Sequence, residues 1–225
     1  MSARPRVWLF DLDDTLHDAS AHIFPHIHAS MAGYIARHLS LTLEDATALR
    51  SHYWRRYGAT LLGMMKHHAV SPRHFLWHTH QFDNLASLLV FEPQLNAVLR
   101  RIPGRKIVFS NGPRHYARQV LQLMGVEQHF DSLSAIEDTR FVPKPAIEGF
   151  RRLLRAEKLA ASRCVLVEDS LANLRTAKRL GFTTVWVSRA LHRPAYVDFK
   201  IKSVGNILDV MRRLVRADGS PPGKV

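Results

Sequence analysis

The chain has little of what marks secreted, disulfide-rich or membrane proteins. Its one cysteine among 225 residues, Cys164, excludes an intramolecular disulfide and any zinc site built from several cysteines, and it favours a reducing compartment. No apolar run approaches the roughly 18 residues of a membrane span. The apolar run after Met1–Arg6 reaches Asp11 too soon for a signal peptide. We therefore expect a cytoplasmic protein without membrane contacts.

Acidic residues are also scarce. Asp and Glu total 19 against 32 Lys and Arg, which gives a net charge of +13 with His neutral. Such a balance favours anionic partners, and it does not choose among nucleic acid, a membrane surface and small phosphorylated molecules. The length and a hydrophobic content of 46% fit one globular domain that carries an insertion.

Outside this insertion, apolar strands alternate with amphipathic helices, which predicts an α/β fold with a Rossmann-like parallel sheet. The predicted strands are 6–12, 107–109, 133–136, 164–167 and 183–187. The predicted helices are 95–101, 114–124, 146–157, 173–180 and 207–215. Segment 218–225 is predicted to be disordered.

The insertion has helical periodicity without a convincing strand. We expect a sheet domain formed by 1–18 and 92–225, and an all-helical subdomain over 19–91. His22 and His26 have the spacing of a helical metal pair, but Pro25 is expected to interrupt the helix. Packed or solvated histidines are therefore favoured over a zinc site.

Polar residues follow several of the predicted strands. Strand 6–12 carries Asp11 near its end and is followed by Asp13. Strand 107–109 is followed by Ser110 and Asn111, and strand 164–167 is followed by Glu168 and Asp169. Lys144 lies in a loop before a helix. In an open α/β sheet, ligands bind at the carboxyl ends of the strands, so these side chains are expected to converge there.

This residue set suits phosphate chemistry beside a metal. Asp11 and Asp13 are two positions apart, so on an extended backbone they project from one face and repel each other. A hard cation such as Mg²⁺ relieves the repulsion and suits a nucleophile. A proton on one carboxyl relieves it as well, and suits a general acid or base. Ser110 and the backbone N–H groups near Asn111 and Gly112 can hold phosphate oxygens, and Lys144 can neutralise their charge.

In this order, the residues resemble the four motifs of the haloacid dehalogenase (HAD) superfamily, subfamily I with a C1 cap. The similar segments are 11–16 (DLDDTL), 109–112 (FSNG), 144–145 (KP) and 168–170 (EDS) followed by Asn173. The motifs span most of the chain, from Asp11 to Asn173.

The resemblance implies a phosphatase. Asp11 would attack phosphorus and form an aspartyl-phosphate, and Asp13 would act as general acid and then as general base. Mg²⁺ would be held by Asp11, the backbone carbonyl of Asp13, and Asp169. Phosphate would be bound by Ser110, Asn111 and Lys144, with Thr15, Gly112, Glu168 and Asn173 in support. Many family members have Asp where Asn173 stands, so a role in orienting Asp169 or a water suits Asn173 better than ligation.

The position of the insertion resembles that of the C1 cap, a lid that closes over the active site and selects small substrates. Segment 57–63 (YGATLLG) resembles pyrimidine 5′-nucleotidases of the superfamily, which implies hydrolysis of UMP or CMP. The candidates for substrate specificity are His17, Tyr57 and Thr60. That group usually has Tyr where this chain has His17, so substrate preference stays open.

Two alternatives remain. The first is a phosphatase for a sugar phosphate or phosphoglycolate. The second is a basic, non-catalytic scaffold for RNA or another polyanion, although no nucleic-acid-binding motif is present. We expect a small phosphorylated metabolite as the partner, no specific nucleic acid, and a monomer or homodimer.

Overall fold

The computed structural model describes residues 6–217, and segment 218–225, for which disorder is predicted, lies outside them. The chain divides into two compact units, one from 1–18 with 90–225 and the other from 19–89. The first unit contains a six-stranded sheet with the order β3-β2-β1-β4-β5-β6. All of its pairings are parallel. The strands are β1 (Val7–Phe10), β2 (Lys106–Phe109), β3 (Ser132–Ser134), β4 (Cys164–Glu168), β5 (Thr183–Val187) and β6 (Phe199–Ile201).

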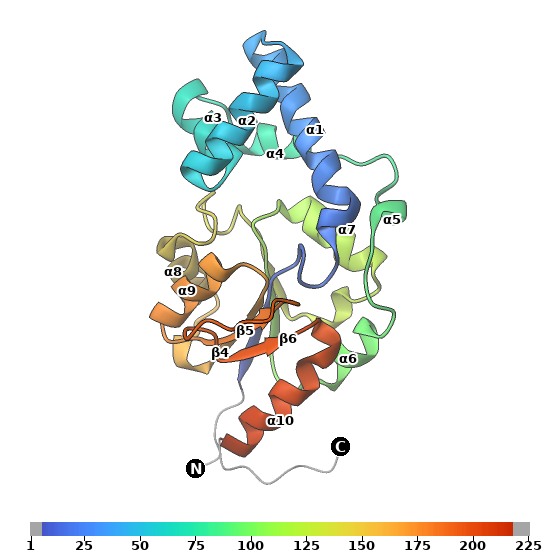
Figure 1. Ribbon diagram of the computed structural model, residues 1–225, viewed down its shortest axis with the longest axis vertical. Helices are drawn as coiled ribbons and strands as arrows, with labels where there is room; N and C mark the ends of the chain where they lie inside the picture. Colours follow the sequence, from blue (N-terminus) through green and yellow to red (C-terminus); the bar gives the residue numbers. More distant parts are fainter. Residues whose placement is uncertain (1–5, 218–225) are drawn as a thin grey trace. The chain divides into compact units, whose positions relative to one another are not determined.

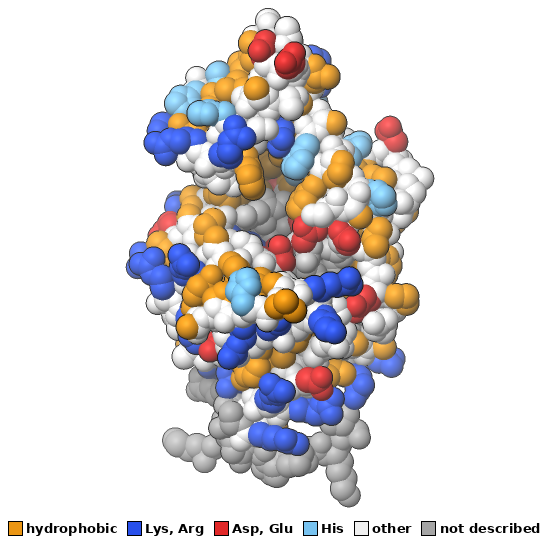
Figure 2. Space-filling view, viewed as in Figure 1, with side chains coloured by type: hydrophobic (Ala, Val, Ile, Leu, Met, Phe, Trp, Pro, Cys, Tyr) orange, Lys and Arg blue, Asp and Glu red, His pale blue; other side chains and the backbone are white. Residues whose placement is uncertain are grey.

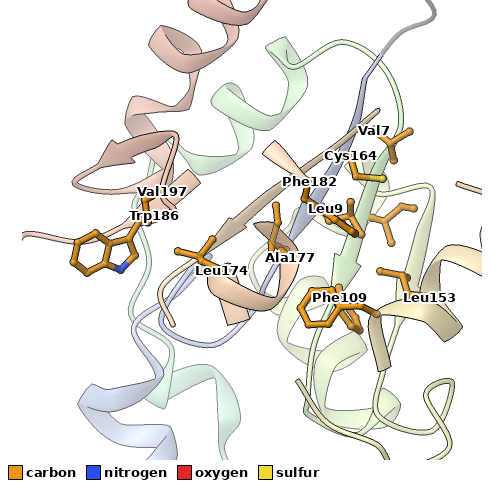
Figure 3. Packing of buried hydrophobic residues seen from close by; sticks show 13 residues of the cluster. Val7, Leu9, Phe109, Leu153, Cys164, Leu174, Ala177, Phe182, Trp186 and Val197 are labelled. Atoms are coloured by element: carbon orange, nitrogen blue, oxygen red, sulfur yellow. The ribbon is translucent and has the colours of Figure 1, made fainter. Parts of the chain in front are cut away.

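Helices cover both faces of this sheet, as the buried apolar strands require. The helices are α6 (Leu95–Arg101), α7 (Arg114–Leu123), α8 (Ile147–Ala156), α9 (Leu171–Arg179) and α10 (Ile207–Ala217). Val7 and Leu9 of β1 face α8 and α9 in one buried cluster (Figure 3). Helices α6 and α10 lie on the other side of the sheet (Figure 1). Short 3₁₀ turns lie at Glu127–His129, Ala161–Arg163 and Val204–Asn206.

The predicted fold class is confirmed, and five of the six strands coincide with predicted ones. Strand β6 was not predicted. It has only three residues, including Lys200, and pairs on one side only, with β5. Such a short edge strand has too little apolar periodicity to be distinguished from a loop.

The second unit is helical throughout its described residues. Its helices are α1 (Ala19–Leu39), α2 (Leu43–Tyr57), α3 (Thr60–His68), α4 (Pro72–Thr79) and α5 (Leu85–Leu88). Helix α2 ends at Gly58, whose φ of 78° suits glycine. Helices α2 and α3 pack so closely that a Cβ on Gly63 would lie 2.1 Å from Cγ of Tyr53.

The predicted break at Pro25 is wrong, because α1 continues through it. A proline inside a helix costs about 3 kcal/mol. The helix buries Ile23, Ile27 and Ile35. Burial of each such side chain contributes about 1.5–3 kcal/mol, which offsets the cost. His26 contacts the backbone carbonyl of Gln81 through Nε2 at 2.9 Å and its ring stacks on Phe82.

Among the described residues, none of the helices has both the length and the apolar character that crossing a membrane requires.

Candidate active site

The carboxyl ends of three neighbouring strands bring the motif residues together. Strand β1 leads into Asp11, β2 into Ser110, and β4 ends at Glu168 beside Asp169. The loop after β1 turns back at Asp14, whose φ of 60° is left-handed. Aspartate tolerates this conformation better than most residues. The turn is closed by the Leu16 N–H, which donates to the Leu12 carbonyl at 2.9 Å.

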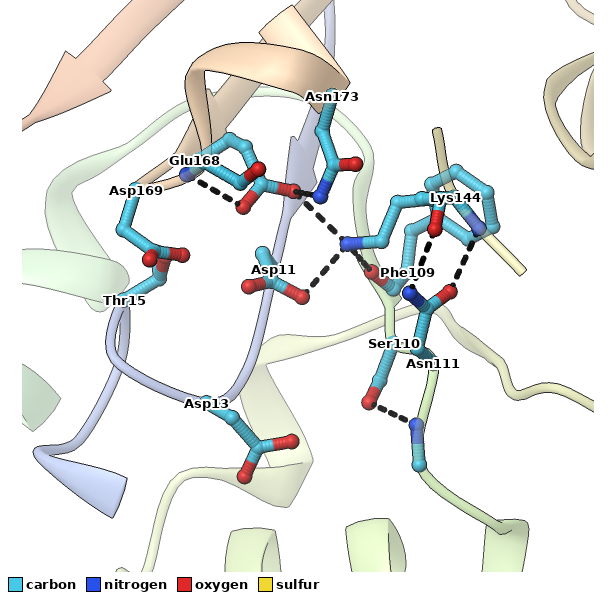
Figure 4. A network of polar contacts seen from close by, with 12 residues as sticks. Asp11, Asp13, Thr15, Phe109, Ser110, Asn111, Lys144, Glu168, Asp169 and Asn173 are labelled. Carbon is cyan, nitrogen blue, oxygen red and sulfur yellow. Dashed lines mark hydrogen bonds and ion pairs between the residues drawn. The ribbon is translucent and has the colours of Figure 1, made fainter. Parts of the chain in front are cut away.

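Lys144 is the centre of the network (Figure 4). Its Nζ donates to Oδ1 of Asp11 at 2.6 Å, to Oε2 of Glu168 at 2.9 Å and to the carbonyl of Phe109 at 2.8 Å. Only 1% of the Lys144 side chain is exposed, so all three donors are used inside the protein. Segments far apart in the sequence are therefore joined by one ammonium group.

Charge and burial oppose each other in this network. Burial alone would lower the pKa of Lys144, but the carboxylates of Asp11 and Glu168 raise it above its ordinary value. The pKa of Asp11 is raised well above its ordinary range by burial and by the charge of Glu168, with Lys144 acting in the opposite direction. The surroundings thus favour the charged form of Lys144, whereas burial and Glu168 disfavour the charged form of Asp11.

Oxygen ligands for a cation lie beside this ion pair. Asp11, Glu168 and Asp169 each offer a carboxylate oxygen, and these atoms lie within 4.8 Å of one another. Burial and the nearby Glu168 raise the pKa of Asp169 to about 7. An all-oxygen set with more negative charge than one lysine neutralises fits a hard divalent cation.

Both carboxylate oxygens of Glu168 have protein partners. Its Oε1 accepts a hydrogen bond from the Ser170 N–H at 3.0 Å, and its Oε2 accepts from Lys144 and, at 3.0 Å, from Nδ2 of Asn173. Asn173 therefore contacts Glu168 rather than Asp169. Asp169 instead accepts a hydrogen bond from the Thr15 hydroxyl at 3.4 Å. This leaves Asp11 and Asp169 as the carboxylates of the cluster that fit direct ligation best.

Asp13 lies apart from this network (Figure 4) and has different partners. The hydroxyl of Tyr116 donates to Oδ1 of Asp13 at 2.5 Å, and Nε2 of His17 lies 3.1 Å from the same oxygen. Burial and Asp13 together raise the pKa of Tyr116, which keeps its hydroxyl protonated as a donor. The two converging contacts fix the orientation of the Asp13 carboxyl group.

The second motif is held by its own polar atoms. Oγ of Ser110 accepts a hydrogen bond from the Gly112 N–H at 2.9 Å. The Asn111 side chain bonds the backbone of Lys144 at both ends, with Nδ2 3.0 Å from the carbonyl and Oδ1 2.8 Å from the N–H. Asn111 thereby ties the loop after β2 to the segment that carries Lys144, a role that the phosphate-binding prediction did not include.

The three specificity candidates are divided between the two units. The His17 side chain is fully buried against Asp13. Tyr57 and Thr60 belong to the helical unit. The Tyr57 hydroxyl lies 2.6 Å from Nε2 of His67, and the buried Thr60 hydroxyl donates to the Arg50 carbonyl at 3.2 Å. Tyr57 is partly exposed, whereas Thr60 serves the packing of its own unit.

Sequence reasoning missed two residues at this site. Tyr116 lies in the first turn of α7, directly after the second motif, and Nε1 of Trp186 donates to the Asp169 carbonyl at 2.8 Å. Trp186 pairs with Glu168 across β5 and β4. Their positions beside motif-bearing strands are the signal that could have found them. Tyr116 resembles a core residue of an amphipathic helix, and Trp186 resembles one of an apolar strand.

Comparisons with known proteins agree with this geometry. The sequence model of the haloacid dehalogenase-like hydrolases matches residues 5–181. The chain is 23% identical to a glyceraldehyde 3-phosphate phosphatase of Methanocaldococcus jannaschii over 92% of this chain and 96% of that protein. It is 21% identical to phosphate metabolism protein 8 of Saccharomyces cerevisiae over 78% of its own length, and the match spans 59% of the yeast protein.

The fold is also similar to that of a HAD phosphatase from Thermococcus onnurineus, as seen in its crystal structure. The TM-score is 0.66 at 20% sequence identity, and the match covers 92% of this chain and 97% of the other.

Proposed function

Because the chain belongs to the haloacid dehalogenase-like hydrolases, we propose that it is a Mg²⁺-dependent phosphomonoesterase with Asp11 as its nucleophile. The observation that carries the proposal is the position of Asp11. Its carboxylate lies 2.6 Å from the buried ammonium of Lys144 and belongs to the same oxygen cluster as Asp169. A carboxylate with cationic support beside a metal site is suited to attack phosphorus and form an aspartyl-phosphate.

The proposed general acid and base is Asp13. It would protonate the leaving oxygen and then remove a proton from the water that hydrolyses the aspartyl-phosphate. Tyr116 and His17 hold one oxygen of this carboxyl group, which restricts its rotation. Asp11 and Asp13 thus have different partners, as two carboxylates with different tasks require.

Mg²⁺ would be held by Asp11, the backbone carbonyl of Asp13, and Asp169. When bound, it would supply positive charge to the phosphate and to the Asp11 carboxylate. Lys144 and Ser110 would bind phosphate oxygens, and Asn111 would position Lys144 through the two backbone hydrogen bonds. Glu168 would hold Lys144 in place, with Asn173 and Ser170 fixing Glu168 in turn.

The helical unit is proposed to act as the C1 cap. Its insertion between the first and second motifs supports this role, as does its independent packing. A cap excludes water and restricts the enzyme to small substrates. Within that class, segment 57–63 favours pyrimidine nucleoside 5′-monophosphates such as UMP and CMP. Tyr57 and His17 remain the proposed specificity residues.

A triose phosphate is the second candidate substrate. Glyceraldehyde 3-phosphate phosphatases of two archaea, Methanocaldococcus jannaschii and Pyrococcus furiosus, match 92% and 93% of this chain. Their identities of 23% and 22% leave room for a change in substrate, because a cap can alter its contacts without altering the chemistry of the sheet domain.

A panel of phosphate esters tests the proposal. Phosphate release is measured with UMP, CMP, AMP, glyceraldehyde 3-phosphate and phosphoglycolate, with Mg²⁺ and with a chelator. We expect Mg²⁺-dependent turnover with the highest kcat/KM for UMP or CMP, and none for Asp11→Asn. A higher kcat/KM for glyceraldehyde 3-phosphate would make this triose phosphate the substrate in place of a pyrimidine nucleotide. Phosphate release that persists with the chelator would contradict the metal site.

A further inference from the structure

A pocket away from the Asp11 network lies at the edge of the sheet, between β6 and α10, and we call it the β6–α10 pocket. It has a volume of about 550 Å³, within the usual range for small-molecule sites. None of the residues proposed for catalysis lines it. The charged residues that line it are Arg193, Asp198, Lys200, Lys202, Asp209 and Arg213.

The two acids of this pocket are already neutralised from outside it. Asp198 accepts a hydrogen bond from Nζ of Lys178 at 2.6 Å and, on its other oxygen, from the Thr184 N–H at 2.9 Å. Asp209 accepts from Nη2 of Arg212 at 2.7 Å. Lys178 and Arg212 do not line the pocket, so neither acid needs a cation from within it.

The four cations of the pocket are not paired with its two acids. Arg193 donates to the backbone carbonyl of Asp198, and Lys200 donates to that of Ala190. A carbonyl group orients a cation without neutralising it. Lys202 and Arg213 are exposed. Within the part of the chain that the structure describes, no salt bridge joins any of the four to a carboxylate.

The surface around the pocket is basic as well. Figure 2 shows Lys and Arg side chains gathered over the part of the molecule that carries β6 and α10. The floor of the pocket is apolar, because Ile201 and Val210 are buried beneath it. A cationic rim above an apolar floor suits a small anion that buries part of its surface and spreads its charge over several side chains.

We propose that the β6–α10 pocket binds a small anion with two or more phosphate groups. The four cations come from β6, the segments beside it and α10, so one phosphate group would engage only part of the set. A chain of linked phosphates can reach strand and helix together. This site is independent of the phosphatase proposal, since it shares no residue with the Asp11 network.

Isothermal titration of the full chain with inorganic tripolyphosphate, at about 50 mM salt, tests the site. The double variant Lys202→Gln/Arg213→Gln removes two of its cations. We expect it to bind about tenfold more weakly than the wild type. Arg151→Gln/Arg179→Gln, which removes two exposed arginines that do not line the pocket, is the matched control and should bind like the wild type. Inorganic phosphate should bind about tenfold more weakly than tripolyphosphate.

Two results would overturn the proposal. One is wild-type affinity in the double variant, which would place tripolyphosphate at the Asp11 site or at scattered lysines. The other is equal weakening in Arg151→Gln/Arg179→Gln, which would make the effect one of net charge alone. The circular dichroism spectrum and the Tm of the double variant should match those of the wild type, which shows that it folds whether or not the phosphatase proposal holds.

Discussion

The two units of the molecule use polar side chains in opposite ways. In the sheet domain, Lys144 joins Asp11, 133 residues away, to Glu168 in a fully buried network of charges. In the helical unit, single hydrogen bonds join the buried tyrosines Tyr34 and Tyr53 to His74 and His68, at 2.8 and 2.7 Å. A buried charge network is costly unless every member is paired, whereas one such hydrogen bond contributes only about 0.5–1.5 kcal/mol to stability. The first network therefore indicates chemistry, and the second indicates packing within the helical unit.

The largest effect is expected where the buried network is broken. Lys144→Met leaves the carboxylates of Asp11 and Glu168 buried without a cation. We expect a loss of about 3–5 kcal/mol in the free energy of unfolding, measured with urea, and no detectable phosphate release. Lys178→Met is the control, because Lys178 also lies 2.6 Å from a carboxylate, that of Asp198, but its side chain is 39% exposed. It should lose about 0–1 kcal/mol.

Adding Glu168→Gln to Lys144→Met should restore part of the lost stability, because it removes one uncompensated charge. If the double variant were less stable than Lys144→Met, charge burial would not be the cause of the loss.

A smaller effect is expected from one hydroxyl group. Tyr116→Phe removes the hydrogen bond to Asp13 while keeping the ring packed. We expect kcat to fall about tenfold with little change in KM, because Asp13 then takes up its reactive orientation less often. Tyr34→Phe removes a comparable hydroxyl, the one bonded to His74, from the helical unit and should leave kcat unchanged. Equal losses in both variants would show that Tyr116 has only a structural role.

The packing of the helical unit can be disturbed without touching the sheet. Gly63→Ala places a methyl group against the buried ring of Tyr53. We expect a loss of about 1–3 kcal/mol, seen as faster hydrogen exchange in α2 and α3 while β1 and β4 stay protected. Gly33→Ala, whose methyl group would meet only the Arg37 guanidinium at 3.4 Å, should gain about 0.5–1 kcal/mol. Faster exchange spread over both units would contradict their independence.

The smallest effect on stability is expected when the pH is lowered. Burial and the charge of Arg50 lower the pKa of His28, and burial together with His67 and His38 lowers that of His68. The folded helical unit therefore favours the neutral forms. The stability they contribute is present above the ordinary histidine pKa of about 6.5 and is lost as the pH falls below it.

Asp169, whose raised pKa acts in the opposite direction, is common to the wild type and to His28→Gln/His68→Gln, so the two proteins are compared. Between pH 7.5 and 5.5, the Tm of the wild type should fall slightly relative to that of the double variant, whereas the wild type and His192→Gln should change alike. A wild-type Tm that rises relative to that of the double variant on acidification would have the wrong sign.

The same contrast explains what could be predicted from the sequence. Strand β1 and its aspartates were predictable because a buried strand has a continuous apolar run and its motif is local. Tyr116 was not, because its partner Asp13 lies 103 residues away and a tyrosine in an amphipathic helix resembles a core residue. The break expected at Pro25 was wrong because the low helix propensity of proline is outweighed by the buried apolar face of α1. Asn111 was found, but its bonds to Lys144 depend on a loop path that spacing does not reveal.

The central claim is that Asp11 is phosphorylated and Asp13 is not. It is tested most directly by rapid quenching of the wild-type protein with Mg²⁺ and UMP, followed by mass spectrometry of the intact chain and fragmentation of the peptide that contains both aspartates. The account predicts one added phosphoryl group, on Asp11 and not on Asp13, and none in Asp11→Asn. A phosphoryl group on another residue, or phosphate release by Asp11→Asn at the wild-type rate, would contradict it.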